Sequence, residues 1–128
     1  MDENQIGRVI IDTAVAIHKD LGPGLLESVY EAILARALSN RGLSVRRQVS
    51  IPIEYAGTVF EQGFRADIVA NALVILEIKS VETVRPVHKK QLLTYLRLTG
   101  MRLGFLLNFG APVMKDGITR IVNGLPED

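Results

Sequence analysis

The 128-residue chain contains no cysteine, and only 5% of its residues are aromatic. The lack of cysteine excludes disulfides, thiolate zinc sites, cysteine-ligated iron–sulfur clusters and a cysteine nucleophile. The scarcity of aromatic residues leaves no evident platform for stacking unpaired bases. No apolar run approaches the roughly 20 residues that a membrane helix needs. We therefore expect no membrane partner and none of these chemistries.

The composition is typical of a folded protein. Hydrophobic residues make up 48% of the chain and charged residues 23%, which predicts a packed core and not a disordered chain. The length suits one domain, so we expect a single domain over residues 1–128. Asp2 and Glu3 stand where a signal peptide would carry basic residues, so we expect a soluble, cytoplasmic protein.

The charges are distributed unevenly along the chain, although the net charge is only +1. Residues 1–31 carry two basic and six acidic side chains, whereas residues 79–102 carry six basic and one acidic side chain. A strongly basic domain would by itself indicate nucleic-acid binding. Here such binding would have to depend on the local basic segment.

Hydrophobic periodicity predicts an α/β fold. Two amphipathic helices come first, over residues 6–21 and 26–41, and each is followed by a glycine. The next predicted elements are strands over 45–55, 64–70 and 73–79, a helix over 86–99, and strands over 103–109 and 118–122. Pro52 predicts an edge position for the first strand because proline lacks an N–H donor. We leave open whether residues 58–62 extend the first hairpin, and we expect a tight turn at Asp116-Gly117.

Glu27 is an unusual residue because it lies on the apolar face of the second predicted helix. With about 100° per residue, its side chain lies within about 20° of Leu34 and 60° of Tyr30. One interpretation is structural: a carboxylate in the first turn caps free N–H groups or complements the helix dipole. The other is functional, with Glu27 facing the sheet.

Asp67 and Glu77 form a predicted pair of carboxylates. If a three-residue connection joins their strands, the two residues face each other, and a two-residue connection would make them diagonal neighbours. Glu77 and Lys79 point to the same face of the sheet because side chains alternate along a strand. Two adjacent carboxylates repel, and one takes up a proton unless a cation lies between them.

A hard divalent cation, Mg²⁺ or Mn²⁺, would suit this pair because it binds oxygen ligands, often one or two carboxylates with substrate phosphate. Lys79 would then orient the attacking water and offset charge that develops on phosphorus. The alternative is an ordinary salt bridge between Lys79 and one carboxylate at the end of a strand.

Four segments occur in order along the chain: Gly24-Leu25-Leu26-Glu27-Ser28-Val29-Tyr30, Gly63-Phe64-Arg65-Ala66-Asp67, Glu77-Ile78-Lys79 and Gln91-Leu92-Leu93-Thr94-Tyr95. Together they resemble the GxxExxY protein family, a branch of the PD-(D/E)XK nuclease superfamily. The resemblance spans nearly the whole chain and implies a restriction-endonuclease-like core, αβββαβ, with a mixed central sheet flanked by helices. The predicted elements from the second helix onward have this order.

The resemblance also implies roles for individual residues. Asp67, Glu77 and the Ile78 carbonyl would bind metal, and Glu27 would complete the acidic cluster and the metal site. Lys79 would be the catalytic lysine. A further helix residue, Gln91, would contact the site or the nucleic acid. Ala66 stands where the superfamily name has proline, which carries no chemistry.

The basic segment fits the same interpretation. Its cationic side chains surround the helix that follows Lys79, where they would neutralise phosphates; they are Arg85, His88, Lys89, Lys90, Arg97 and Arg102. The alternative is a solvated helix face on which lysines cover apolar surface. By family analogy we expect nucleic acid as the partner, DNA before RNA, and pairing of two copies as a homodimer.

The function that the sequence favours is therefore a Mg²⁺-dependent or Mn²⁺-dependent nuclease that hydrolyses DNA phosphodiesters with metal-activated water. A non-catalytic module that binds nucleic acid or protein is the main alternative, although it would not need Asp67, Glu77 and Lys79 together. A purely structural subunit would leave Glu27 on an apolar face without a purpose.

Overall fold

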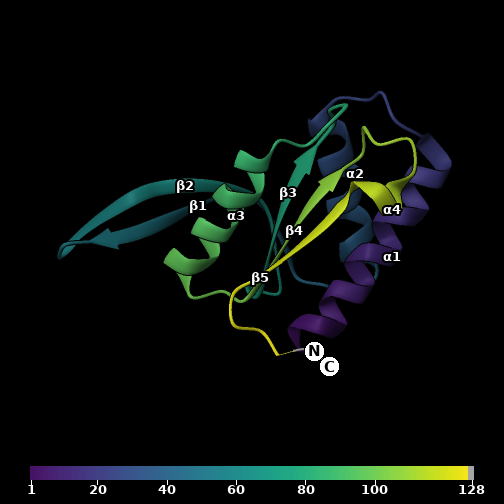
Figure 1. Ribbon diagram of the computed structural model, residues 1–128. Helices are drawn as coiled ribbons and strands as arrows, with labels where there is room; N and C mark the ends of the chain where they lie inside the picture. Colours follow the sequence, from purple (N-terminus) through teal and green to yellow (C-terminus); the bar gives the residue numbers. More distant parts are fainter. Residues whose placement is uncertain (127–128) are drawn as a thin grey trace.

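The computed structural model describes residues 1–126 and is an α/β fold (Figure 1). Within these residues the elements are α1 (Glu3–Leu21), α2 (Glu27–Asn40), β1 (Val45–Tyr55), β2 (Thr58–Ala70), β3 (Val74–Lys79), α3 (Pro86–Thr99), β4 (Leu103–Asn108), α4 (Met114–Gly117) and β5 (Ile118–Val122). The predicted fold class and order of elements are confirmed, and α4 is added. No helix of the described part is both long and apolar enough to cross a membrane.

The five strands form one mixed sheet in the order β1-β2-β3-β4-β5. β3 and β4 are parallel, and every other neighbouring pair is antiparallel. α1 and α2 cover one face, whereas α3 packs on the other (Figure 1). β1 is an edge strand, as Pro52 predicted.

The side chains of β3 alternate between the two faces as a regular strand requires. Val74, Leu76 and Ile78 are buried in the core with α1 and α2, and Ile75 is buried in the core with α3. Glu77 and Lys79 are two and four residues after Ile75, so their side chains lie on the same face of the sheet, the face covered by α3.

The helix ends follow from local sequence. Asp2 accepts a hydrogen bond of 2.8 Å from the Gln5 N–H, and Gln5 accepts one from the Asp2 N–H, which closes a capping box on α1. Gly22 ends α1 with a φ of 67°, and Gly100 ends α3 with a φ of 73°. Both values favour glycine because a Cβ would be strained there.

β2 is longer than predicted and runs unbroken through residues 58–63. Glycine at position 63 lets β2 pass close to Ile53 on the facing strand. A Cβ at this position would lie only 2.6 Å from Cγ2 of Ile53. The pairing register shifts between Ile51 and Ile53, as at a β-bulge. β3 pairs only with the last part of β2, so the β1–β2 hairpin projects beyond the rest of the sheet (Figure 1).

The connection between β4 and β5 also differs from the prediction. The expected tight turn at Asp116-Gly117 is instead the end of the short helix α4. Gly117 lies so close to the Asn108 carbonyl that a Cβ would come within 2.2 Å of its oxygen. Glycine at this position therefore reflects close backbone packing, which a turn pattern does not reveal.

Candidate functional site

Asp67 and Glu77 lie opposite each other on β2 and β3. Ile68 faces Leu76 and Ala70 faces Val74 in this antiparallel pair, and continuing the register by one residue aligns Asp67 with Glu77. Residues 71–73 connect the two strands. The three-residue connection is confirmed, so the diagonal alternative is wrong.

Glu77 is largely buried, and its electrostatics reflect its neighbours. Desolvation by burial and the Asp67 carboxylate raise the pKa of Glu77 to about 8, whereas the charge of Lys79 lowers it. Within the described residues, Glu77 Oε1 is buried and has no hydrogen-bond partner. A buried oxygen without a partner is costly, so this part of the site favours a proton or a cation.

Asp67 is held in place by backbone and side-chain donors. The Ile78 N–H donates to Asp67 Oδ2 at 2.7 Å. A side-chain amide hydrogen of Gln48 lies near the other oxygen, with Nε2 at 3.5 Å from Oδ1. The Asp67 carboxylate is thereby attached to β3 between Glu77 and Lys79.

Lys79 ends β3 and is half-buried on the same face as Glu77. Its backbone is fixed by β4: it pairs with Asn108, and its carbonyl accepts a 2.8 Å hydrogen bond from the Phe109 N–H. Lys79 forms no ion pair with any residue in 1–126. The salt-bridge alternative therefore does not describe this structure.

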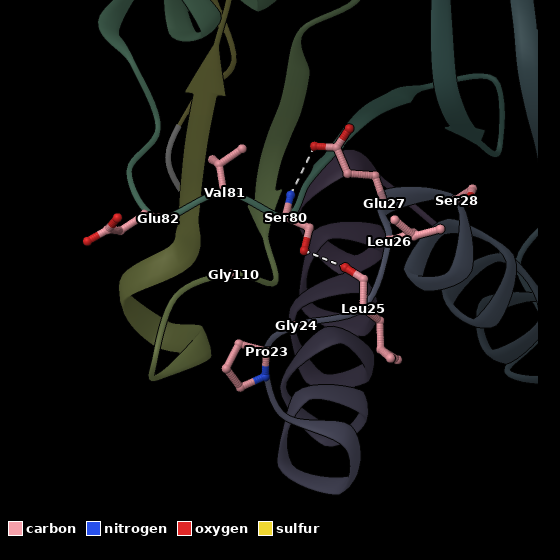
Figure 2. A pocket seen from close by; sticks show the side chains of 10 residues that line it. All are labelled: Pro23, Gly24, Leu25, Leu26, Glu27, Ser28, Ser80, Val81, Glu82 and Gly110. Carbon is pink, nitrogen blue, oxygen red and sulfur yellow. Dashed lines mark hydrogen bonds between the residues drawn. The ribbon is translucent and has the colours of Figure 1, made fainter.

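Glu27 reaches from α2 to the end of β3. It is exposed, and its Oε2 accepts a 3.0 Å hydrogen bond from the N–H of Ser80, the residue after Lys79 (Figure 2). No side chain caps α2, whose N-cap is Leu26, so the capping part of the structural interpretation is wrong. Glu27 does lie in the first turn, where its charge complements the helix dipole. Its carboxylate also reaches the end of β3, in the direction that the helix rotation predicted.

The loop before α2 explains why Glu27 has this position. Gly24 has a φ of 113°, which side chains other than glycine rarely adopt. The buried Tyr30 hydroxyl donates to the Gly22 carbonyl and accepts from the Leu25 N–H. Ser80 Oγ donates to the Leu25 carbonyl at 2.7 Å (Figure 2), so the loop is attached to the end of β3.

An open cavity of about 860 Å³ lies beside these contacts. Residues 23–28 line one side, and Ser80, Val81, Glu82 and Gly110 line the other (Figure 2). Its lining includes Glu27 but not Asp67, Glu77 or Lys79, so the cavity lies beside the strand carboxylates and does not enclose them.

The residues of the site fit a divalent cation. Asp67, Glu77 and the Ile78 carbonyl supply hard oxygen ligands of the kind that Mg²⁺ prefers. The buried Oε1 of Glu77 has no hydrogen-bond partner among the described residues, so it is free to bind a cation. No group of three or more acidic or histidine side chains in residues 1–126 is close enough to hold a metal. The structure thus brings two of the three predicted carboxylates together, and a metal role for Glu27 stays a prediction.

Comparison with protein families gives a match over most of the chain. A sequence model of the PD-(D/E)XK nuclease superfamily matches residues 4–121. The chain belongs to the PD-(D/E)XK nuclease superfamily. Its mixed sheet flanked by helices agrees with the restriction-endonuclease-like fold of that superfamily. A comparison with curated proteins gives no match.

For a member of this superfamily, α3 contributes an additional residue to the site. Burial raises the pKa of Tyr95, and the charges of Glu77 and Asp67 raise it further, whereas a hydrogen bond with Gln91 lowers it. The Tyr95 ring stacks on Phe64 of β2 with centroids 3.7 Å apart. Gln91 therefore contacts Tyr95, a residue to which the sequence interpretation gave no role, and a role for Gln91 at the site stays a prediction.

The predicted phosphate contacts of this PD-(D/E)XK protein divide into two groups. Arg85, Lys89, Lys90 and Arg97 are exposed. His88 Nδ1 accepts a 3.3 Å hydrogen bond from the Arg85 N–H, and Arg102 is paired with Glu3 through bonds of 3.0 and 3.1 Å. His88 and Arg102 therefore have structural contacts, and a nucleic-acid role for the exposed group stays a prediction.

Helix rotation separates the exposed cations of α3. Leu92 and Leu96 face the core, and at about 100° per residue Lys90 and Arg97 point away from it. Lys89 lies on the side opposite Gln91 and lines a cavity of about 290 Å³ together with Glu82 and Asp116. Lys90 and Arg97 are therefore better placed than Lys89 to contact a phosphate backbone.

Glu31, one helical turn after Glu27, was missed by the sequence interpretation. It is a buried acidic residue of α2 and contacts Arg47 and Gln48 of β1. The sequence did contain an indication of Glu31. It is an acidic residue one helical turn after Glu27 and directly after Tyr30, in a helix predicted to pack on the core.

Proposed function

We propose that this chain is a nuclease that uses Mg²⁺ or Mn²⁺ to hydrolyse DNA phosphodiester bonds. The observation that carries the proposal is the Asp67–Glu77 pair, in which two carboxylates oppose each other and Glu77 Oε1 is buried without a partner. A cation between them would remove both the repulsion and the missing contact. A module that only binds nucleic acid has no need for such a pair.

Asp67, Glu77 and the Ile78 carbonyl would hold the ion. When bound, a divalent ion polarises a phosphoryl oxygen and lowers the pKa of bound water. Lys79 lies on the same face of β3, where its ammonium would orient the attacking water by hydrogen bonding. The same charge would offset the negative charge that develops on the phosphate.

Glu27 and Gln91 would act from the two helices beside the strands. Glu27 accepts from the Ser80 N–H with Oε2, which leaves Oε1 of the same carboxylate to accept a proton or to bind the ion. Gln91 would hold the Tyr95 hydroxyl through the hydrogen bond they share. Both groups would supplement the two strand carboxylates without replacing them.

The substrate class follows from charge and from family. Lys90 and Arg97 are exposed cations on the outward face of α3, which suits a polyphosphate backbone. The preference for DNA over RNA, the finer assignment to the GxxExxY branch and pairing as a homodimer rest on the sequence resemblance.

A cleavage assay tests the proposal. Labelled single-stranded and double-stranded DNA and RNA are incubated with the purified protein in Mg²⁺, Mn²⁺ or EDTA. We expect DNA cleavage in Mg²⁺ or Mn²⁺ and none in EDTA. DNA binding without cleavage under any condition would favour the non-catalytic module.

A further inference from the structure

A buried carboxylate on α2 anchors two consecutive residues of β1. Glu31 Oε2 accepts from the Arg47 guanidinium, with Nε at 3.0 Å and Nη2 at 2.9 Å. Glu31 Oε1 accepts a 2.6 Å hydrogen bond from Nε2 of Gln48. Both oxygens of a side chain that is nearly inaccessible to solvent are therefore occupied.

Consecutive residues of a regular strand point to opposite faces, so Arg47 and Gln48 should not reach the same carboxylate. The backbone of Gln48 accounts for the exception because its φ is 50°. Residues other than glycine rarely adopt this left-handed conformation, and it costs about 1 kcal/mol or more. The strained backbone is what turns the Gln48 amide toward Glu31.

Gln48 occupies the position of β1 that faces Asp67. Its neighbours in the chain pair with the residues on either side of Asp67, Arg47 with Ile68 and Val49 with Ala66. The Gln48 amide nitrogen that donates to Glu31 is also 3.5 Å from Asp67 Oδ1. Both carboxylates can only accept, which fixes the amide with its NH₂ group between them.

β2 is irregular at the same place. Ala66 belongs to the core under α3, and Ile68 belongs to the core under α1 and α2, although residues two apart on a regular strand share a face. The two facing strands therefore both depart from regular alternation at Gln48 and Asp67. The orientation of the Asp67 carboxylate depends on this local geometry.

We propose that Gln48 is a positioning residue for the metal site, held by Glu31 so that its amide limits the rotation of the Asp67 carboxylate. This inference rests on the proposed function, because it concerns how Asp67 is presented to a divalent cation. Ile78 fixes Oδ2 of Asp67 from one side, and Gln48 lies against Oδ1 from the other. Partners that orient a metal ligand in this way typically contribute 10-fold to 100-fold in affinity.

Two variants of Gln48 separate this role from a general effect on folding. Gln48→Gly removes the amide and relieves the positive φ, whereas Gln48→Met removes the amide donor and keeps both the length and the strain. We expect Gln48→Met to melt at a lower temperature than Gln48→Gly without metal. We expect both to bind Mn²⁺ alone, measured by isothermal titration calorimetry, about tenfold more weakly than the wild type.

Ala72 provides a matched control because it is another residue with a positive φ, 55°, in the exposed turn between β2 and β3. Ala72→Gly should leave the Mn²⁺ affinity unchanged. In DNA cleavage assays at subsaturating Mn²⁺, the Gln48 variants should have a lower kcat than the wild type. The factor should be similar to their loss of Mn²⁺ affinity, and KM for DNA should be unchanged.

The outcomes separate the two proposals. If the wild type binds Mn²⁺ and the Gln48 variants bind it equally well, the positioning role is overturned and the proposed function stands. A loss of affinity that follows the melting temperature, larger in Gln48→Met than in Gln48→Gly, would also overturn it in favour of a structural role. Wild-type protein that neither binds Mn²⁺ nor cleaves DNA would overturn both.

Discussion

Asp67 accepts a 2.7 Å hydrogen bond from the backbone N–H of Ile78, the residue between Glu77 and Lys79. This bond joins the carboxylate of β2 to the middle of the Glu-Ile-Lys tripeptide on β3. Because a backbone donor moves only with its strand, the spacing of Asp67, Glu77 and Lys79 is set by sheet pairing. The candidate site is therefore part of the sheet and does not depend on a flexible loop.

The first prediction concerns metal and stability. Millimolar Mg²⁺ or Mn²⁺ should raise the melting temperature because an ion that binds only the folded state stabilises it. Asp67→Asn should abolish this rise, whereas Asp116→Asn, at an exposed position of α4, should retain it. Thermal melts with and without metal measure the effect, and an equal rise in Asp67→Asn would place the metal site elsewhere.

The raised pKa of Glu77 predicts a dependence of stability on pH. Between its ordinary pKa of 4.5 and the folded value of about 8, the folded protein holds a proton that the unfolded chain has released. Raising the pH through this window therefore lowers the free energy of unfolding, by at most about 1.4 kcal/mol per pH unit. Below the window and above it, Glu77 contributes no further slope.

Glu77→Gln isolates this contribution because the amide does not titrate. Urea unfolding without metal at a series of pH values should give a steeper loss of stability for the wild type than for Glu77→Gln across this range. Identical pH profiles would show that Glu77 does not hold a proton in the folded state.

Glu27→Gln tests whether the charge of this residue matters. The amide oxygen can still accept from the Ser80 N–H, so the free energy of unfolding should change by about 1 kcal/mol or less. Metal affinity and cleavage should nevertheless fall together if the carboxylate charge belongs to the site. Glu82→Gln, which changes another exposed carboxylate of the same cavity, serves as the control. A fully active Glu27→Gln protein would contradict the assignment.

The outward face of α3 predicts a salt effect on DNA binding. Replacing both Lys90 and Arg97 with alanine should weaken binding to all sequences and make the slope of log affinity against log salt shallower by about two. Lys19→Ala, which removes an exposed charge near the end of α1, should not change the slope. Filter binding at several salt concentrations would provide the slopes, and an unchanged slope in the double variant would make this face ordinary solvated surface.

The sequence predicted much of the site because its main geometry follows from simple periodicity. The register that brings Asp67 beside Glu77 follows from a three-residue connection between β2 and β3, and the direction of Glu27 follows from helix rotation. Gln48 could not be predicted in this way. A positive φ at a residue other than glycine leaves no mark in a hydrophobic pattern, since it is imposed by contacts between distant residues.

The same reasoning explains the errors in the fold. The sequence left open whether residues 58–62 extend the first hairpin, and Gly63, which permits close contact with Ile53 on the facing strand, lies within β2. Gly117 was interpreted as part of a turn, but it lies against the backbone at Asn108. In both cases glycine is required by tertiary packing, and a local pattern cannot distinguish that from a turn.

The most direct test of the central claim is a single-turnover cleavage assay on labelled DNA in Mg²⁺ with wild-type protein and Lys79→Met. Methionine retains most of the side-chain length and leaves Asp67 and Glu77 in place. We predict that the wild type cleaves and that Lys79→Met binds the same DNA within a few fold but does not cleave it. Equal cleavage rates for the two proteins would contradict the catalytic assignment of Lys79.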